Sequence, residues 1–203
     1  MIINEIEKEK KNKTYLIKFS NNKELICNEE LIVNYLLRKG KEIDDQTYEI
    51  LISKANLYIY YDKALTYLTK GLKSEHKIYT YLIGKGANND EACEVVDILK
   101  SKKLLNDTSY FKHLTDYYLH NQYGPYYIEQ KGRLENIDSQ IIDNIISEID
   151  YSFLSVSIDN LIKKYLKINN KISDKNKLKF KLKSYLFNRG FPSELINKKI
   201  GEI

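Results

Sequence analysis

The sequence predicts a mostly α-helical protein of tandem three-helix repeats, preceded by a short β element. Two observations lead to this fold class. Apolar residues recur at helical spacing over most of the 203 residues, and one local pattern returns at shifts of 50 and 104 residues. Self-similarity at about this period is typical of stacked helical repeats. We therefore expect an elongated array in which each repeat packs on its neighbours.

The repeated pattern is two positions one helical turn apart, followed by a residue that tolerates a left-handed backbone. Its three copies are Ile78, Leu82 and Gly86, then Ile128, Gly132 and Asn136, and then Leu182, Leu186 and Gly190. Glycine and asparagine at the last position predict a helix that ends in a capped turn. The weak point is Gly132, because glycine inside a helix costs roughly 1 kcal/mol relative to alanine. A shift of 46 avoids this mismatch but loses the match in the next helix, so we keep 50.

A further helix follows each capped turn, with apolar residues at the i, i+3, i+4, i+7 spacing of one helix face. These residues are Ala92, Val95, Val96 and Leu99 in the first copy, Ile142, Ile145, Ile146 and Ile149 in the second, and Ile196 and Ile200 in the third. We accordingly divide the chain into an N-terminal extension and three repeats. The predicted bounds are 1–60, 61–106, 107–151 and 152–203.

The extension is predicted to begin with a β meander, because Tyr15, Ile17 and Phe19 alternate with polar residues ahead of a polar turn. Asn28 suits the cap of a helix, and Gly40 suits its end. The predicted elements are strands at about 2–8, 14–19 and 23–27, a helix from Asn28 to Lys39, and a helix at about 45–55, which 57–61 joins to the first repeat.

Nine helices are predicted in the repeats. They span about 61–71, 74–85 and 89–102, then 107–121, 125–135 and 138–150, and then 153–168, 175–188 and 192–200. Pro125 and Pro192 fall in first helical turns, where a missing N–H costs nothing. The segment 175–183 alternates lysine with other residues, as a half-buried strand would, but Leu178 and Leu182 also fit a helix, and the repeat alignment favours the helix.

The sequence gives little support for an enzyme. It contains no glycine-rich phosphate loop and no hydrolase nucleophile motif. The histidines share no metal-ligand spacing with acids or thiols: His76, His113 and His120. Cys27 and Cys93 are expected to be small buried or half-buried thiols. We therefore expect no catalytic residue, no metal and no cofactor.

The N-terminus is charged within five residues, and no apolar run approaches the roughly 18 residues that would span a bilayer. A cytoplasmic protein is expected. Charge is uneven along the chain: residues 87–150 carry 6 basic against 12 acidic residues, a net charge of −6, whereas residues 151–203 carry 12 against 4, a net charge of +8. This asymmetry indicates a polyanionic partner for the basic end.

Cations are concentrated on two predicted helices of the last repeat, and a solvated lysine-rich face is the alternative explanation. Arg189 ranks first individually, because a guanidinium engages phosphate or carboxylate through two bonds. Tyrosines gather around Gly124 and Pro125: Tyr117, Tyr118, Tyr123, Tyr126 and Tyr127. They form either a recognition patch or aromatic packing between helices.

Several stretches, in order and spacing, resemble the RecX family of RecA regulators. They are A-L-T-Y-L at 64–68, L-L-N-D-T-S-Y-F at 104–111, Y-G-P-Y-Y-I at 123–128 and Y-L-F-N-R-G-F at 185–191. The segment before residue 44 is similar to the β-containing extension of longer members. Two departures stand out: Phe111 occupies a position that is usually small, and the helix after Pro125, usually basic, begins Tyr126-Tyr127-Ile128-Glu129.

The resemblance implies a curved body that lies in the groove of the RecA–DNA filament and limits ATP hydrolysis and strand exchange in recombination and repair. It implies a monomer that meets single- or double-stranded DNA through the filament. The alternative is a general nucleic-acid-binding repeat protein that needs no RecA. Candidate contact residues are Lys70, Lys73, Lys77, Lys131, Arg133, Lys163, Lys164, Lys167, Lys179, Lys183 and Arg189.

Overall fold

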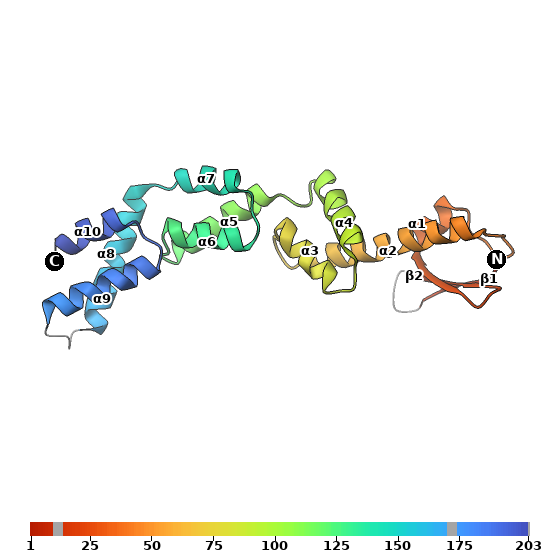
Figure 1. Ribbon diagram of the computed structural model, residues 1–203, viewed down its shortest axis with the longest axis horizontal. Coiled ribbons are helices and arrows are strands. Elements are labelled where there is room, and N and C mark those ends of the chain that lie inside the picture. Colours follow the sequence, from red (N-terminus) through yellow and green to blue (C-terminus); the bar gives the residue numbers. More distant parts are fainter. Residues whose placement is uncertain (10–13, 170–173, 203) are drawn as a thin grey trace. The chain divides into compact units, whose positions relative to one another are not determined.

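The computed structural model describes residues 1–9, 14–169 and 174–202 (Figure 1). The described residues are mostly helical, with a three-stranded antiparallel sheet near the N-terminus, so the predicted fold class is confirmed. The chain forms two compact units, Met1–Leu105 and Asn106–Ile203. Each unit has its own buried core.

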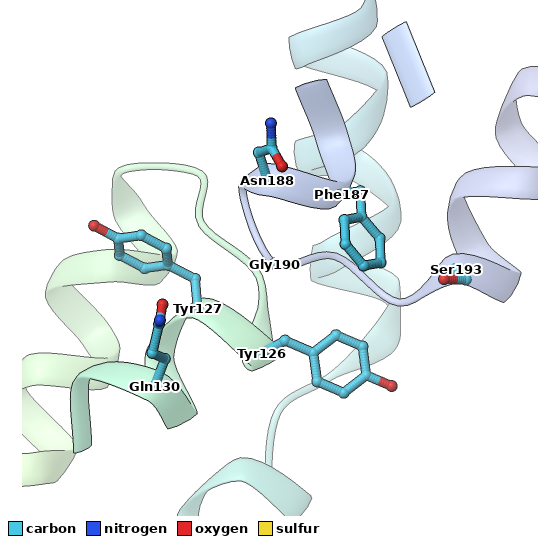
Figure 2. A pocket seen from close by; sticks show the side chains of 7 residues that line it. All are labelled: Tyr126, Tyr127, Gln130, Phe187, Asn188, Gly190 and Ser193. Carbon is cyan, nitrogen blue, oxygen red and sulfur yellow. The ribbon is translucent and has the colours of Figure 1, made fainter. Parts of the chain in front are cut away.

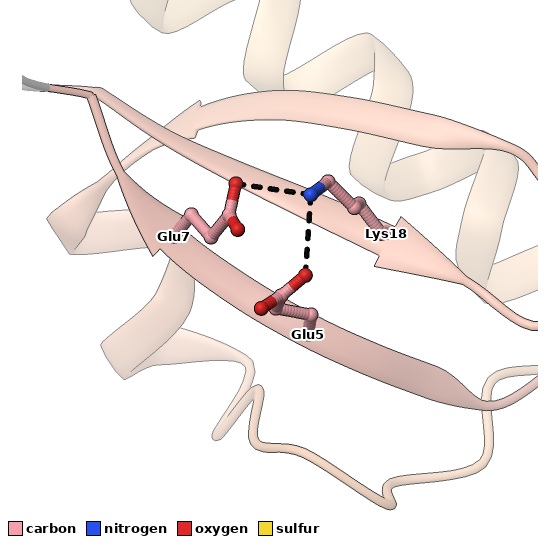
Figure 3. A network of polar contacts seen from close by, with 3 residues as sticks. All are labelled: Glu5, Glu7 and Lys18. Atoms are coloured by element: carbon pink, nitrogen blue, oxygen red, sulfur yellow. Dashed lines mark hydrogen bonds and ion pairs between the residues drawn. The ribbon is translucent and has the colours of Figure 1, made fainter.

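The sheet consists of β1 (Ile3–Lys8), β2 (Thr14–Phe19) and β3 (Glu24–Asn28), in the order β1-β2-β3. The inner face of the sheet buries Ile17 and Phe19, which belong to the segment where apolar and polar residues alternate. Residues of β3 and of the helix that packs on the sheet are buried with them. On β2, Lys18 Nζ lies 3.1 Å from a Glu5 carboxylate oxygen and 3.0 Å from one of Glu7 (Figure 3). The hydrogen bond to Glu7 is the main reason why the pKa of Lys18 is raised. Exposed ion pairs of this kind add little stability, so burial on the inner face holds the sheet.

The first helix is shorter than predicted. α1 (Glu29–Asn34) begins after the Asn28 cap, as expected, but ends before Lys39. Leu36 adopts a left-handed φ of 47°, and the N–H of Leu37 donates to the carbonyl of Ile32 at 2.9 Å. This turn buries Leu37, which is 5% exposed. Burial of that side chain therefore outweighs the strain of a non-glycine residue in the left-handed region.

The second helix is longer than predicted. α2 (Asp45–Leu68) is continuous where a helix at 45–55, a joint at 57–61 and a separate helix from 61 were expected. No glycine or proline interrupts the segment, so nothing in its backbone chemistry ends the helix there. Leu51 and Ala55 pack on the sheet, whereas Ala64 belongs to the next core. One helix thus serves the extension and the first repeat.

The remaining helices are α3 (Glu75–Ile83), α4 (Asn89–Ser101), α5 (Asp107–His120), α6 (Pro125–Leu134), α7 (Ser139–Ser147), α8 (Tyr151–Ile168), α9 (Lys175–Asn188) and α10 (Ser193–Gly201). They follow the predicted order closely. The segment 175–183 is helical, as the repeat alignment predicted. Pro125 is the first residue of α6, whereas Pro192 is the cap residue just before α10.

The predicted capped turns occur in all three repeats. Gly86, Asn136 and Gly190 have φ values of 94°, 52° and 81°. In each case the next residue donates its N–H to the carbonyl five residues before it, at 3.1, 3.1 and 3.4 Å respectively. This bond is the signature of a Schellman cap. The shared cap confirms the shifts of 50 and 104 residues.

Gly132, the weak point of the alignment, has a packing explanation. It lies on α6 where the other repeats place Leu82 and Leu186, both fully buried. A Cβ at Gly132 would lie 2.6 Å from Cε2 of Phe111 and 2.9 Å from Cδ1 of Ile142. Phe111, on α5, is itself fully buried. The middle repeat thus fills its core from α5, and the glycine makes room for the ring.

We expect Gly132→Ala to lower the free energy of unfolding by about 1–3 kcal/mol, the usual cost of overpacking a core. The methyl would collide with Phe111, and this outweighs the roughly 1 kcal/mol by which alanine favours a helix. Urea denaturation measures the change. Adding Phe111→Leu should recover part of the loss.

The matched control is Gly201→Ala, because among the described residues no atom beyond its own stretch of helix lies within 4 Å of a Cβ at this glycine. Its stability should be unchanged or slightly higher. Equal stability of the two alanine variants would contradict the packing explanation.

Candidate functional site

The last repeat presents most of the predicted cations to solvent. Its core takes one face of each helix, and Ile158 on α8, Leu182 on α9 and Ile196 on α10 are all nearly inaccessible. The outer faces carry the lysines. Those exposed to solvent are Lys163, Lys164 and Lys167 at the end of α8 and Lys175, Lys177, Lys181 and Lys183 on α9, while Lys179 is half-buried. Amphipathic packing alone therefore places a basic face on this repeat.

The carboxylates of this repeat do not neutralise that face. Asp174 caps α9 by accepting from the backbone N–H groups of Asn176 and Lys177. Asp159 accepts from Lys199 Nζ at 2.7 Å, and this hydrogen bond raises the pKa of Lys199. Within the described ranges, Lys163, Lys167, Lys179 and Lys183 pair with no carboxylate. These four lysines are available to an anionic partner.

Other predicted cations have local contacts. Lys164 Nζ donates to Gln122 Oε1 at 3.2 Å, and Arg133 pairs with Glu129 at 2.7 Å on the same helix. Lys131 Nζ lies 4.9 Å from the centre of the Tyr127 ring. The two candidate cations of the middle repeat, Lys131 and Arg133, therefore both have local contacts.

The first-repeat candidates lie in the other unit. Lys73 Nζ donates to the carbonyl of Gly71 at 3.1 Å and lies 5.0 Å from the centre of the Tyr67 ring. Lys70 is exposed and Lys77 is half-buried on α3. These lysines and the basic face of the last repeat therefore belong to different compact units.

Arg189, the first-ranked candidate, stands at a joint between repeats. Its Nη1 donates to the carbonyl oxygens of Asn121 and Gln122 at 3.2 and 3.1 Å. Its guanidinium carbon lies 4.8 Å from the centre of the Tyr123 ring and 5.2 Å from that of Tyr185. The side chain thus caps the end of α5 and contacts two tyrosine rings. Sequence reasoning missed this role, because the partners are carbonyls 67 and 68 residues away.

The backbone makes the same joint. The N–H of Gly124 donates to the carbonyl of Arg189 at 2.8 Å, and that of Tyr126 donates to the carbonyl of Gly190 at 3.0 Å. A Cβ on Gly124 would collide with the Gly190 carbonyl, and one on Gly190 would collide with the backbone nitrogen of Tyr127. Only glycine permits this approach. The Gly-Pro and Arg-Gly-Phe stretches were the sequence signal for it.

The tyrosines near this joint divide into two groups. Tyr118, Tyr123 and Tyr127 pack on one another, with ring centres 4.2 to 5.6 Å apart. Burial raises the pKa of Tyr118. Tyr117, whose ring centre lies 5.3 Å from that of Tyr118, and Tyr126 nevertheless remain 62% and 58% exposed. Packing accounts for the first group, and only the second is free to meet a partner.

An open pocket of about 520 Å³ lies beside the joint, between α6 and the α9–α10 turn. Its lining residues are Tyr126, Tyr127, Gln130, Phe187, Asn188, Gly190 and Ser193. Figure 2 shows the Gly190 backbone passing between the Tyr126 and Phe187 side chains, with the Tyr127 ring directed away from both. Sequence reasoning did not identify this pocket, because its walls come from two repeats.

The described residues contain no cluster of three or more histidine, cysteine or acidic side chains that would hold a metal. Cys27 is buried, which raises the pKa of its thiol to about 11, whereas Cys93 is exposed, contrary to expectation. No helix in the described part of the chain has the length and apolar character to cross a membrane.

We expect Arg189→Ala to lower the free energy of unfolding by about 1–3 kcal/mol, because two charge-assisted hydrogen bonds to backbone carbonyls are lost. Arg189→Lys should not restore it, since an ammonium does not reproduce the planar stacking and forked donors. Thermal or urea denaturation measures both variants. Lys183→Ala, on the exposed face of α9, is the control and should leave stability unchanged. Wild-type stability of Arg189→Ala would contradict the structural role.

The chain is similar to known proteins in sequence and in fold. A family model described as RecX, third three-helix domain, matches residues 158–200, the three helices that carry the basic face. Crystal structures share the fold: one of regulatory protein RecX has a TM-score of 0.81 at 19% identity, covering 100% of this chain and 99% of the other. That of RecX from Lactobacillus salivarius has a TM-score of 0.65 at 22% identity, over 72% of this chain and 96% of the other.

Sequence relatives cover almost the whole chain. Regulatory protein RecX of Streptococcus mutans is 30% identical over 185 residues, which are 90% of this chain and 70% of that protein. The protein of the same name from Streptococcus equi subsp. equi is 31% identical over 196 residues, 96% of this chain and 74% of the relative. That of Clostridium acetobutylicum is 28% identical, over 99% of this chain and 95% of the relative. With this identity, coverage and fold, the chain belongs to the RecX family of regulatory proteins.

Proposed function

We propose that this protein binds the filament that RecA forms on DNA and lowers its ATP hydrolysis and strand exchange. Membership in the RecX family and the exposed, unpaired lysines of the last repeat support the proposal. The lysines are the observation that carries it. Lys163, Lys167 and Lys183 lie on the repeat that matches the third RecX domain, and no carboxylate of the described residues pairs with them.

The contact between the last repeat and the filament is mainly electrostatic in this proposal. A groove in a nucleoprotein filament offers phosphates and acidic protein surface, and residues 151–203 carry a net charge of +8. Each phosphate that a lysine neutralises releases counterions, so binding should weaken as salt rises. The middle repeat, whose candidate cations Lys131 and Arg133 have local contacts, would act mainly as a spacer. We propose that the protein acts as a cytoplasmic monomer and catalyses no reaction itself.

The function is tested by retention on biotinylated single-stranded DNA, either bare or coated with RecA, at one salt concentration. We expect stronger retention on the coated DNA and slower RecA ATP hydrolysis as the protein is added. Equal retention on both, with unchanged ATP hydrolysis, would contradict RecA regulation. That result would favour a general nucleic-acid-binding repeat protein, which the basic face alone also supports.

The site is tested by Lys163→Glu, Lys167→Glu and Lys183→Glu in one variant. If each lysine meets one phosphate, the slope of log affinity against log salt should become less negative by about 2 to 3. Affinity for the filament should fall as well. Circular dichroism checks that the variant remains folded.

The matched control reverses three exposed lysines of the Met1–Leu105 unit: Lys39→Glu, Lys54→Glu and Lys103→Glu. It changes net charge by the same amount and should keep most of the affinity and the salt slope. If the C-terminal variant binds as the wild type does, the basic face only keeps the protein in solution and this site is wrong.

A further inference from the structure

The pocket beside the Gly124–Gly190 joint has an aromatic side chain on each wall. Tyr126 from α6 is 58% exposed and Phe187 from α9 is 59% exposed. Figure 2 shows both rings on the side of the joint on which Ser193 lies. Large aromatic side chains are seldom left this accessible together unless they meet a partner. Each ring therefore offers an accessible face to a flat apolar group.

The rest of the pocket is polar. Gln130 and Asn188 contribute amide groups and Ser193 contributes a hydroxyl. Within the described residues, the Gln130 and Asn188 side chains have no hydrogen-bond partner. Amides and hydroxyls that lack an internal partner suit a ligand with donors and acceptors along its edge. A purely apolar ligand would leave these groups unsatisfied.

The same face continues along α9. Phe180 is 71% exposed and lies two helical turns before Phe187, with Lys183 between them. Residues at this spacing share one helix face, and seven residues of helix span about 10 Å. From Lys175 to Ser193 the sequence contains five lysines and no acidic residue. Phe180, Lys183 and Phe187 thus lie on one face of α9, and this face leads to the pocket.

We infer that this surface binds the unstacked bases of single-stranded DNA, with bases stacked on the exposed rings of Tyr126, Phe187 and Phe180. Every base has a π-face, so aromatic side chains take successive bases with little regard to sequence, while lysines neutralise the backbone. The inference rests on the proposed function, since the filament supplies the DNA. It goes further by assigning base contacts to the last repeat.

A protein partner fits the surface less well. The central parts of protein interfaces are depleted in lysine, which is abundant here. Two carboxylates lie near the pocket: Glu129, which is held by Arg133, and Glu194 at the start of α10. No charged side chain lines the pocket itself, and Lys183, on the face of α9 that carries Phe180 and Phe187, has no carboxylate partner in the described ranges. A strand that carries one negative charge per nucleotide matches this balance.

The test uses the full chain and two fluorescent probes of equal length and charge: a 30-mer of thymidylate and a 30-mer in which most sugars are abasic. The wild type should bind the thymidylate strand on the order of tenfold more tightly, because stacking adds to the phosphate contacts. Phe187→Ala and Tyr126→Ala should each weaken thymidylate binding by roughly five- to tenfold. Neither should change abasic binding or the salt slope.

The control is Tyr151→Ala, which removes an aromatic side chain of similar exposure, 64%, from α8. Its binding to both probes should equal that of the wild type. Equal wild-type affinity for the two probes, or equal losses from Tyr151→Ala and Phe187→Ala, would overturn the inference. So would a loss of RecA-filament retention in Phe187→Ala with unchanged binding to free thymidylate, because the pocket would then hold a protein side chain.

These outcomes are separable from failure of the proposed function. If wild-type protein slows RecA ATP hydrolysis but does not distinguish the two probes, regulation stands and the base contacts are wrong. If it prefers the thymidylate strand but has no effect on RecA, the base contacts stand and RecA regulation is wrong.

Discussion

The approach of two backbone turns at Gly124 and Gly190 determines how the middle and last repeats are arranged. Two backbone hydrogen bonds, both donated from the Gly124 turn, join them, and no side chain fits between them. Once the turns are this close, the carbonyls that end α5 face Arg189, and its guanidinium satisfies them. The pocket lies at the same joint, because Tyr126 and Phe187 flank these glycines in sequence and in space. One steric constraint thus fixes both a structural contact and a candidate binding surface.

Each repeat ends its second helix with the same kind of capped turn but fills its core with different residues. A left-handed residue caps the second helix in every copy, so the chain leaves that helix through the same turn, and only the filling of the core varies. The middle copy exchanges a large residue on α6 for a large residue on α5, with Gly132 beside Phe111. The position of Phe111 is one where the family resemblance led us to expect a small residue. Two departures that look unfavourable separately therefore compensate each other.

Much of the fold follows from local sequence, whereas most of the site does not. Caps at Gly86, Asn136 and Gly190, and the alternating strand at Tyr15–Phe19, are signals contained within a few residues, and the structure has them where expected. The length of α2 was mispredicted because half-buried residues near its middle pack in two cores and blur the helical pattern. The role of Arg189 depends on carbonyls 67 and 68 residues away. Side-chain type alone gave no means of separating it from the exposed lysines.

The ambiguity of residues 175–183 has a physical origin that bears on function. A helix that only packs on its neighbours needs one apolar face, and α9 meets that need with Leu182 and Leu186, which are buried. Phe180 and Phe187 are surplus to this core and lie exposed among lysines. Phe180 lies two residues before the core residue Leu182, so apolar residues and lysines alternate in this segment as they would in a half-buried strand. Where the local pattern of a sequence conflicts with its fold, a functional or strained position is the expected cause. In this chain the conflict falls on the exposed aromatic surface, which is why we assign binding to this face of α9 rather than to its charge alone.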